Sequence, residues 1–405
     1  MDANATPRNT EHHNTSSSSS QVGGDNTGQV AGTAPTADHP FPEAPGSRLS
    51  VASQRQLIWW KFRKHKPALV SAVIVIFIYL VAIFAPFLAP FGADEFDARY
   101  TYAPPQPLHF FHERRFVGPF VYGLTQTVEQ EAMRRVFTVD PEQRILMGFF
   151  VQGVSYNFLE IIQGDRHFFG PIDPKQKVYL LGGDHLGRDV LSRIIYGTRI
   201  SMSIGLVGVF LSLVIGIILG GISGYYGGKI DELIQRTIEI IRSIPTIPLW
   251  MGLAAAIPKS WSSIQIYFAI TVILSLIGWT GLARVVRGRF LSLREEDFVM
   301  AARLDGLSET RIILRHMVPA FISHIIASLT LSIPGVILAE TSLSFLGLGI
   351  QPPAVSWGVL LNEAQNVRAV AAAPWLLIPA GVVVFVVLVL NFLGDGLRDA
   401  ADPYN

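Results

Sequence analysis

Six long apolar runs constrain this 405-residue chain more than any other feature of its sequence. A helix rises about 1.5 Å per residue, so about 20 apolar residues cross the roughly 30 Å hydrocarbon core of a bilayer. One Arg or Asp at a helix centre costs roughly 2.5–3.5 kcal/mol on insertion. A soluble protein would have to bury six such runs separately. Membrane spans free of charge at their centres are therefore predicted at 67–89, 200–226, 238–257, 266–283, 321–339 and 374–394.

Composition narrows the class of protein further. Charged residues make up 16% of the chain, whereas ordinary soluble domains carry about 25%. The net charge of +1 offers no basic excess for nucleic acid, so no nucleic-acid partner is expected. With no cysteine, the chain has no disulfide and no thiolate metal site. It also lacks a phosphate-binding loop and any acid at the centre of a span, so a partner must supply the energy for any uphill transport.

Lys and Arg gather in the flanks of three spans. Because cytoplasmic flanks carry an excess of these residues, both termini and the two Arg-rich links are predicted to be cytoplasmic. The connection that follows the first span is then external. The basic flanks are 55–66 before the first span, 229–242 in the second-to-third link and 284–315 in the fourth-to-fifth link.

The segments outside the spans have three different compositions. Residues 1–50 are rich in Ser, Thr, Asn, Gly and Pro, which predicts a disordered tail. Residues 51–66 mix Trp and Phe with five cations, which is typical of an interfacial helix; a calmodulin-like target is the alternative. Residues 396–405 are expected to form a cytoplasmic tail.

Residues 90–196 are too polar to span a membrane and are predicted to form an external insertion module. Three stretches rich in aromatic and β-branched residues predict strands in it. His109, His112 and Glu113 could ligate a metal, but a surface cluster is the favoured interpretation and no metal site is predicted. The predicted strand stretches are 116–123, 135–139 and 145–152.

The link 292–319 predicts a helix–turn–helix bracket on the cytoplasmic face. Ser292 and Glu295 have the spacing of a capping box, which predicts a helix over 293–305. Gly306 suits the left-handed residue that ends such a helix. The alternative is a solvated connecting loop.

A second helix is predicted after this turn. Ser308 is placed to cap it, Glu309 complements its dipole, and Pro319 ends it. Spacing of i, i+3, i+4 and i+7 predicts a buried stripe on this helix. The positions of the stripe are Thr310, Ile313, Leu314 and Met317.

The bracket resembles the EAA loop of ABC importer permeases, and the C-type subunit of dipeptide/oligopeptide importers resembles it most. The motif is Met300-Ala301-Ala302 with Gly306, followed after nine residues by His316-x-Val318-Pro319. Met300 stands where the family has glutamate, and the first external segment is longer than is usual. Further stretches that resemble the family are 183–193, 224–231, 242–245, 340–349, 352–353, 356–358 and 391–399.

The resemblance implies the type I ABC importer permease fold: an all-α polytopic membrane protein with six transmembrane helices, a core at 197–395 and an external, partly β insertion between helices 1 and 2. It implies a docking role toward an ATPase for part of the bracket. Arg311 and Arg315 could pair with acids on that ATPase or be solvated cations. The implied docking residues are Ala301, Ala302, Gly306, Ser308, Glu309 and Pro319.

The resemblance also implies the partners. These are a second, B-type permease subunit, two ABC ATPase subunits that bind ATP and Mg, an extracytoplasmic solute-binding protein, the lipid bilayer and a di- or oligopeptide substrate. The chain itself is expected to be no enzyme, to bind no cofactor, and to lie in the bacterial inner membrane.

Alternatives remain at two points. Asp184, Arg188 and Asp189 are expected to form a structural ion-pair cluster at the outer mouth, with a role in substrate binding as the alternative. The transported solute could instead be nickel or another small solute. A membrane sensor or scaffold, whose bracket recruits a signalling partner, is the alternative from a different class.

Overall fold

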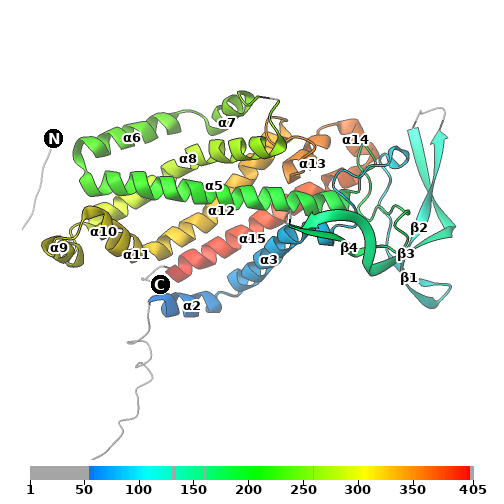
Figure 1. Cartoon of the computed structure of the whole chain (residues 1–405), viewed down its shortest axis with the longest axis horizontal. Helices are drawn as coiled ribbons and strands as arrows, with labels where there is room; N and C mark the ends of the chain where they lie inside the picture. Colours follow the sequence, from blue (N-terminus) through cyan, green and yellow to red (C-terminus); the bar gives the residue numbers. More distant parts are fainter. Residues whose placement is uncertain (1–53, 130–133, 159–160, 259, 402–405) are drawn as a thin grey trace, which may run out of the picture. The chain divides into compact units, whose positions relative to one another are not determined.

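The computed structural model describes residues 54–129, 134–158, 161–258 and 260–401. The predicted tail at 1–50 lies outside these residues. Long helices form a bundle, and a four-stranded sheet is inserted between the first and second of them (Figure 1). Within the described ranges, five helices are long and apolar enough to cross a membrane, or six if one bent pair counts as a single span. The predicted helical membrane protein with a partly β insertion is confirmed.

The helices follow the order of the predicted spans, with shorter helices between them. The long helices of the bundle are α3 (Lys66–Ile83), α5 (Val190–Tyr226), α8 (Ser263–Leu293), α12 (Ile322–Phe345) and α15 (Ile378–Ala401). The bent pair is α6 (Gly228–Ser243) and α7 (Thr246–Ala255). The shorter elements are α2 (Gln54–Lys64), α4 (Ala85–Leu88), η1 (Ala98–Tyr100), α9 (Asp297–Leu304), α10 (Glu309–Ile312), the π-helix η2 (Ile313–Met317), α11 (Val318–Ala320), α13 (Trp357–Glu363), α14 (Val367–Ala372) and η3 (Pro374–Leu377).

The third predicted span differs most from the structure. Instead of one helix over 238–257, α6 and α7 meet at an angle of 87°. Pro245 stands at the break, and proline cannot continue a helix because it lacks an N–H and its ring clashes with the preceding turn. Helix α15 continues through Ala401, so most of the predicted tail 396–405 is helical.

The second and fourth spans extend beyond their apolar runs. Helix α5 begins at Val190, inside the region predicted as the insertion, and α8 continues to Leu293. These two helices pack closely because glycines of α5 face α8. A Cβ on Gly220 would lie 2.4 Å from the Ala283 carbonyl oxygen, so only glycine permits this approach.

The sheet is antiparallel, with strand order β1-β2-β3-β4. Its strands are β1 (His109–His112), β2 (Arg115–Glu129), β3 (Arg134–Phe158) and β4 (Ile162–Pro171). The first half of β3 pairs with β2 and the second half with β4. Two of the three predicted strand stretches therefore belong to one long strand, because a bulge opposite Tyr122 and Gly123 accommodates the polar residues 140–144 without ending it.

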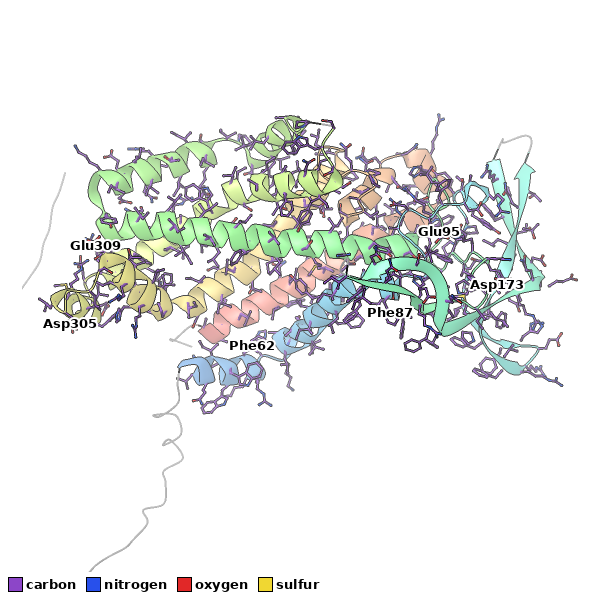
Figure 2. The ribbon with its side chains drawn as sticks, in the orientation of Figure 1. Phe62, Phe87, Glu95, Asp173, Asp305 and Glu309 are labelled. Carbon is purple, nitrogen blue, oxygen red and sulfur yellow. The ribbon has the colours of Figure 1, made fainter. Side chains whose placement is uncertain are left out.

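Two segments flagged in the sequence acquire packing roles. The rings of His109 and His112 contact Phe120 and Tyr122, so these histidines are part of the packing of the sheet. The basic aromatic segment forms α2. Its Phe62, labelled in Figure 2, is buried against Ala68 and Ala400, while both tryptophans of α2 stay exposed.

Candidate functional site

The bracket forms at the end of the bundle away from the sheet, where Asp305 and Glu309 are labelled in Figure 2. Its first helix, α9, ends at a glycine turn as predicted. Gly306 has a φ of +74°, and the Leu307 N–H donates to the Ala302 carbonyl oxygen at 3.2 Å. This is a Schellman-type end. A Cβ on Gly306 would meet nothing within 4 Å, so the left-handed backbone is what requires glycine there.

The predicted capping box is wrong. Ser292 lies inside the last turn of α8, and α9 begins only at Asp297, after Glu296. The fourth span continues past the membrane-length run as an unbroken helix, so Ser292 is not at a helix start. Ser308 does occupy the N-cap position of α10, although its side chain makes no capping hydrogen bond.

Buried apolar side chains attach the bracket to the bundle. Ala302 is 4% exposed and belongs to this cluster, so it packs the bracket and does not face outward as a docking residue. The cluster joins α9 and α10 to the ends of α5, α8 and α12. Its buried members are Tyr225, Val286, Phe290, Val299, Ala302, Ile312, Met317, Phe321 and Ile325.

The predicted apolar stripe of the second helix is only partly right. Met317 is buried, but Leu314 is 61% exposed and Ile312 is buried in its place. Residues 313–317 form a π-helix, whose period is longer than that of an α-helix. The buried residues Ile312 and Met317 are therefore five positions apart. The spacing of i, i+3 and i+4 expected for an α-helix could not predict this.

The outward surface of the bracket combines apolar and cationic side chains. Leu304 is 88% exposed, and a groove of about 550 Å³ lies across α10 to α11. Apolar side chains gathered on an exposed surface mark sites of protein interaction. The groove is lined by Ser308, Thr310, Arg311, Leu314, Arg315 and Pro319.

Two polar contacts tie neighbouring helix ends to this region. The Tyr226 hydroxyl donates to Glu309 Oε2 at 2.6 Å, which links the end of α5 to α10. The Arg287 guanidinium of α8 makes a bidentate pair with Asp231 of α6, with both contacts at 2.5 Å. The first contact joins the bracket to α5, and the second joins α8 to α6.

The predicted ion-pair cluster lies at the end of the bundle that carries the sheet. Asp184 accepts from Arg188 Nε at 2.6 Å and from Arg193, and both arginines also donate to Glu363 Oε1, at 2.9 and 2.8 Å. The cluster connects the loop before α5 to α13. Among the described residues Asp189 has no ion-pair partner; it caps α5 by accepting from the Ser192 N–H at 2.8 Å and from its hydroxyl at 2.6 Å.

Sequence reasoning missed Arg193 and Glu363. Arg193 follows Asp189 by one helical turn, so its place on the same side of α5 could have been found. Glu363 lies 170 positions further along the chain and carries no local signal. Only the fold brings it to the arginines.

The environment shifts the pKa values of the ionisable groups here. Burial raises the pKa of Asp189 to about 6, against the hydrogen bonds from Ser192. The hydrogen bond to Glu363 raises the pKa of His185 despite partial burial. Burial acts to raise the pKa of Glu363, but the hydrogen bond from His185 and the charge of Arg193 together hold it below its usual value.

Asp184, His185 and Glu363 also have the spacing of a three-ligand metal group. Their carboxylate oxygens already accept from two buried guanidinium groups, which supply the positive charge that a cation would otherwise bring. A metal ion beside these arginines would be repelled at low dielectric. The chemistry of this donor set therefore favours the ion-pair cluster.

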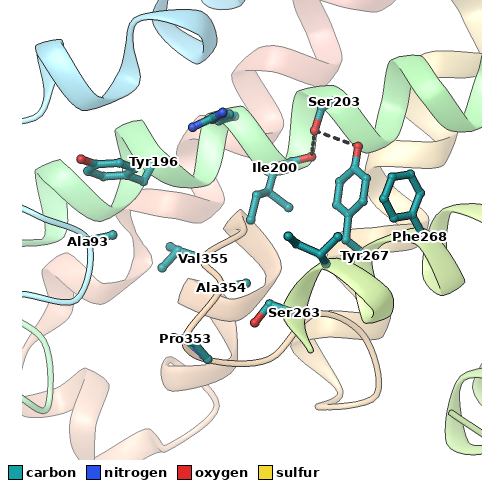
Figure 3. Close-up of a pocket in the computed structure, with 12 residues that line it drawn as sticks. Ala93, Tyr196, Ile200, Ser203, Ser263, Tyr267, Phe268, Pro353, Ala354 and Val355 are labelled. Atoms are coloured by element: carbon teal, nitrogen blue, oxygen red, sulfur yellow. Dashed lines mark hydrogen bonds between the residues drawn. The ribbon is translucent and has the colours of Figure 1, made fainter. Parts of the chain in front are cut away.

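A pocket of about 470 Å³ opens between α5, α8 and the loop after α12 (Figure 3). Tyr196, Ile200 and Ser203 of α5 line it together with Tyr267 and Phe268 of α8. The Tyr267 hydroxyl donates to Ser203 Oγ at 3.1 Å, as drawn in Figure 3. No sequence motif predicted this pocket, because its residues come from four separate segments.

Arg199 contributes the one cationic side chain among the residues that line this pocket. It is exposed, and within the part of the chain that the structure describes it has no hydrogen-bond or ion-pair partner. A guanidinium is suited to carboxylate ligands because it offers donors in a fixed fork. The pocket thus combines aromatic surface with one free cation.

Comparisons with known proteins place the chain among transport permeases. The family described as "Binding-protein-dependent transport system inner membrane component" matches residues 212–404, and "N-terminal TM domain of oligopeptide transport permease C" matches residues 53–105. The MetNI methionine ABC transporter in an inward-facing conformation is a more distant solved structure, 17% identical over 52% of this chain and 97% of that chain, with a TM-score of 0.41.

Two curated relatives carry the assignment. The oligopeptide transport system permease protein OppC of Haemophilus influenzae is 43% identical over 56% of this chain and 70% of the relative. The dipeptide transport system permease protein DppC of Bacillus subtilis is 29% identical over 89% of each chain. The protein is thus a multi-pass inner-membrane component of a complex whose ATPase is a separate subunit, and it binds no cofactor itself. The chain belongs to the OppC/DppC family of permease subunits of binding-protein-dependent ABC importers.

Proposed function

We propose that this chain forms half of a translocation path for di- and oligopeptides and that its bracket transmits the motion of the ATPases to that path. The observation that carries the proposal is the buried cluster shared by α9, α10, α5, α8 and α12. A surface held in this way cannot move without moving the spans. The outer side of the same bracket is exposed, apolar and cationic, as a docking surface would be.

The proposed complex has four kinds of protein subunit, of which the two permeases lie in the lipid bilayer. A B-type permease completes the path, two ABC ATPases bind ATP and Mg, and an external solute-binding protein delivers substrate. The bracket and both termini would face the cytoplasm, because the flanks rich in Arg and Lys lie there. Toward the ATPase we assign docking to Ala301, Gly306, Ser308, Glu309 and Pro319, with Arg311 and Arg315 as ion-pair partners.

Peptide as the substrate is supported by the names of the relatives and by the pocket of Figure 3. Its aromatic lining suits apolar side chains, and Arg199 suits a peptide carboxylate. Nickel would need nitrogen, oxygen or sulfur ligands such as imidazole or carboxylate. The residues that line this pocket include no His, Asp, Glu or Cys. The pocket therefore favours peptide over the nickel alternative.

The function is tested by transport into proteoliposomes. The chain is reconstituted with its B-type permease, ATPases and binding protein, and ATP-dependent uptake of a labelled peptide and of nickel is measured. We expect peptide uptake that requires ATP. Arg199→Gln should reduce uptake of a peptide with a free carboxyl terminus more than uptake of its amidated form. Uptake of nickel alone would refute the peptide assignment, and a chain that co-purifies with no ATPase would support the sensor or scaffold.

A further inference from the structure

The hairpin formed by the second half of β3 and by β4 exposes an unusual amount of apolar surface. At its tip Ile161 is 83% exposed and Ile162 is 62% exposed. Further along the two strands, three phenylalanine rings are also exposed, namely Phe149, Phe150 and Phe168. A water-facing hairpin would carry polar side chains at these positions.

Aromatic contacts hold this hairpin against the end of the first span. The ring of Phe158, beside the tip, stacks on Phe84 with centroids 5.5 Å apart. The rings of Phe150 and Phe168 each lie 6.0 Å from Phe87, which is labelled next to the hairpin in Figure 2. His167 Nδ1 also contacts the Ala89 carbonyl oxygen at 2.6 Å. The hairpin thus curves back along the end of α3 and α4, as Figure 1 shows.

The apolar surface of the hairpin continues the apolar surface of α3. Along α3 and at its end, Val73, Ile76, Phe77, Leu80 and Phe84 are exposed. In a membrane protein such side chains on a span face lipid. Phe84 follows the last residue of α3, which is the depth where aromatic belts lie at a membrane–water interface. The Phe84–Phe158 stack therefore brings the hairpin to that same depth.

We propose that the β3–β4 hairpin is a membrane-interface element, with Ile161 and Ile162 inserted among the lipids of the leaflet on the side of the sheet. Lipid is the occupant because the exposed surface is continuous with the lipid-facing side of α3.

The polar groups of the hairpin set how deep it can lie. Gln152 Nε2 donates to Asp165 Oδ2 at 3.0 Å, and the Tyr156 hydroxyl donates to the Arg166 carbonyl oxygen at 2.9 Å. β4 is an edge strand, so one side of its backbone is unpaired and cannot enter the hydrocarbon core. The hairpin therefore lies in the interfacial layer, where water and headgroups pair with that edge.

The test uses the absence of native cysteine from this chain. Single-cysteine variants Ile161→Cys, Phe77→Cys and Val139→Cys are spin-labelled in the full transporter, whose other subunits are made cysteine-free, and the complex is placed in liposomes. Phe77 is the lipid benchmark on α3, and Val139 is an exposed residue on the part of the sheet that pairs with β2. Accessibility to oxygen, which concentrates in lipid, is compared with accessibility to a water-soluble nickel chelate.

We expect the label at residue 161 to be relaxed more by oxygen than by the chelate, as at residue 77, and the label at residue 139 to show the reverse ratio. A ratio at residue 161 equal to that at residue 139 overturns the proposal. So does protection of residue 161 from both reagents in the complex together with exposure to the chelate in the isolated subunit, because a protein partner would then cover the tip.

Discussion

At the scale of single residues, Glu363 contacts three basic side chains at the end of the bundle that carries the sheet. Its carboxylate accepts from two buried guanidinium groups and from His185. The side chain of Arg193 is 1% exposed, so water cannot replace the carboxylate if it is lost. Removing one member of a buried ion pair leaves the other charge without compensation.

Glu363→Gln is therefore expected to destabilise the purified subunit by about 3–5 kcal/mol, the usual cost of breaking a buried pair from one side. The measurement is the unfolding midpoint in detergent. Arg236→Gln is the matched control, because Arg236 and Glu239 form an exposed pair, and such pairs contribute about 0–1 kcal/mol. Equal losses for the two variants would show that the cluster is not effectively buried.

The pair of His185 and Glu363 makes the free energy of unfolding depend on pH. The hydrogen bond to Glu363 raises the pKa of His185 above its ordinary 6.5. A raised pKa means that the stabilisation is complete below pH 6.5 and is lost as the pH rises through the folded-state pKa. Unfolding midpoints measured from pH 5.5 to 8.5 should fall over that window, and His185→Gln should flatten the fall. An unchanged slope in His185→Gln would contradict this assignment.

Gly306 is the residue on which the shape of the bracket depends. Gly306→Ala should cost about 1 kcal/mol, because an L-residue with a Cβ disfavours a φ of +74°. We expect a fall in ATP-dependent uptake at normal membrane insertion, measured as transport per inserted complex. Gly288→Ala is the control: this exposed helical glycine of α8 also has open space around it but no positive φ, so the change should stabilise by about 0.5–1 kcal/mol. Normal uptake by Gly306→Ala would argue against coupling through the turn.

At the scale of elements, the bracket carries exposed apolar side chains on the side where we propose that the ATPase docks. Leu304→Asp places a charge on the outward side of α9 without touching the buried cluster. We expect the ATPase subunits to be lost on co-purification, while the B-type permease is retained. Val139→Asp, an equally non-conservative change on the sheet, should leave both partners bound. Retention of the ATPases by Leu304→Asp would move the docking surface elsewhere.

How far the sequence could predict these elements depends on which force sets each boundary. The spans were predictable because a charge in hydrocarbon is costly, and that rule acts on every residue of a run. The continuation of α8 to Leu293 was not predictable from hydropathy. A helix can extend into water with polar side chains, so the end of the apolar run does not mark the end of the helix. The burial of Ala302 and the π-helix at 313–317 follow from tertiary packing against α5 and α12, which no local pattern encodes.

At the scale of the whole described chain, the two ends of the bundle have different constructions. The end with the sheet is joined by a buried cluster of charges together with buried apolar side chains, whereas the other end is joined by apolar side chains and by two less buried polar contacts. The charged cluster joins the loop before α5, and α5 itself, to α13. The apolar cluster at the other end attaches the bracket to α5, α8 and α12. In the proposed function the end with the bracket docks the ATPase, and the peptide path lies between the two ends.

One last consequence follows from the length of α5. Its 37 residues make a rod of about 55 Å, well beyond the roughly 30 Å that hydrocarbon requires. The helix begins after its N-cap residue Asp189 and ends at Tyr226. One unbroken helix is therefore long enough to reach from one aqueous side of a membrane to the other. A tilt of this helix at its Tyr226 end would therefore also move its Asp189 end, because no break separates the two ends.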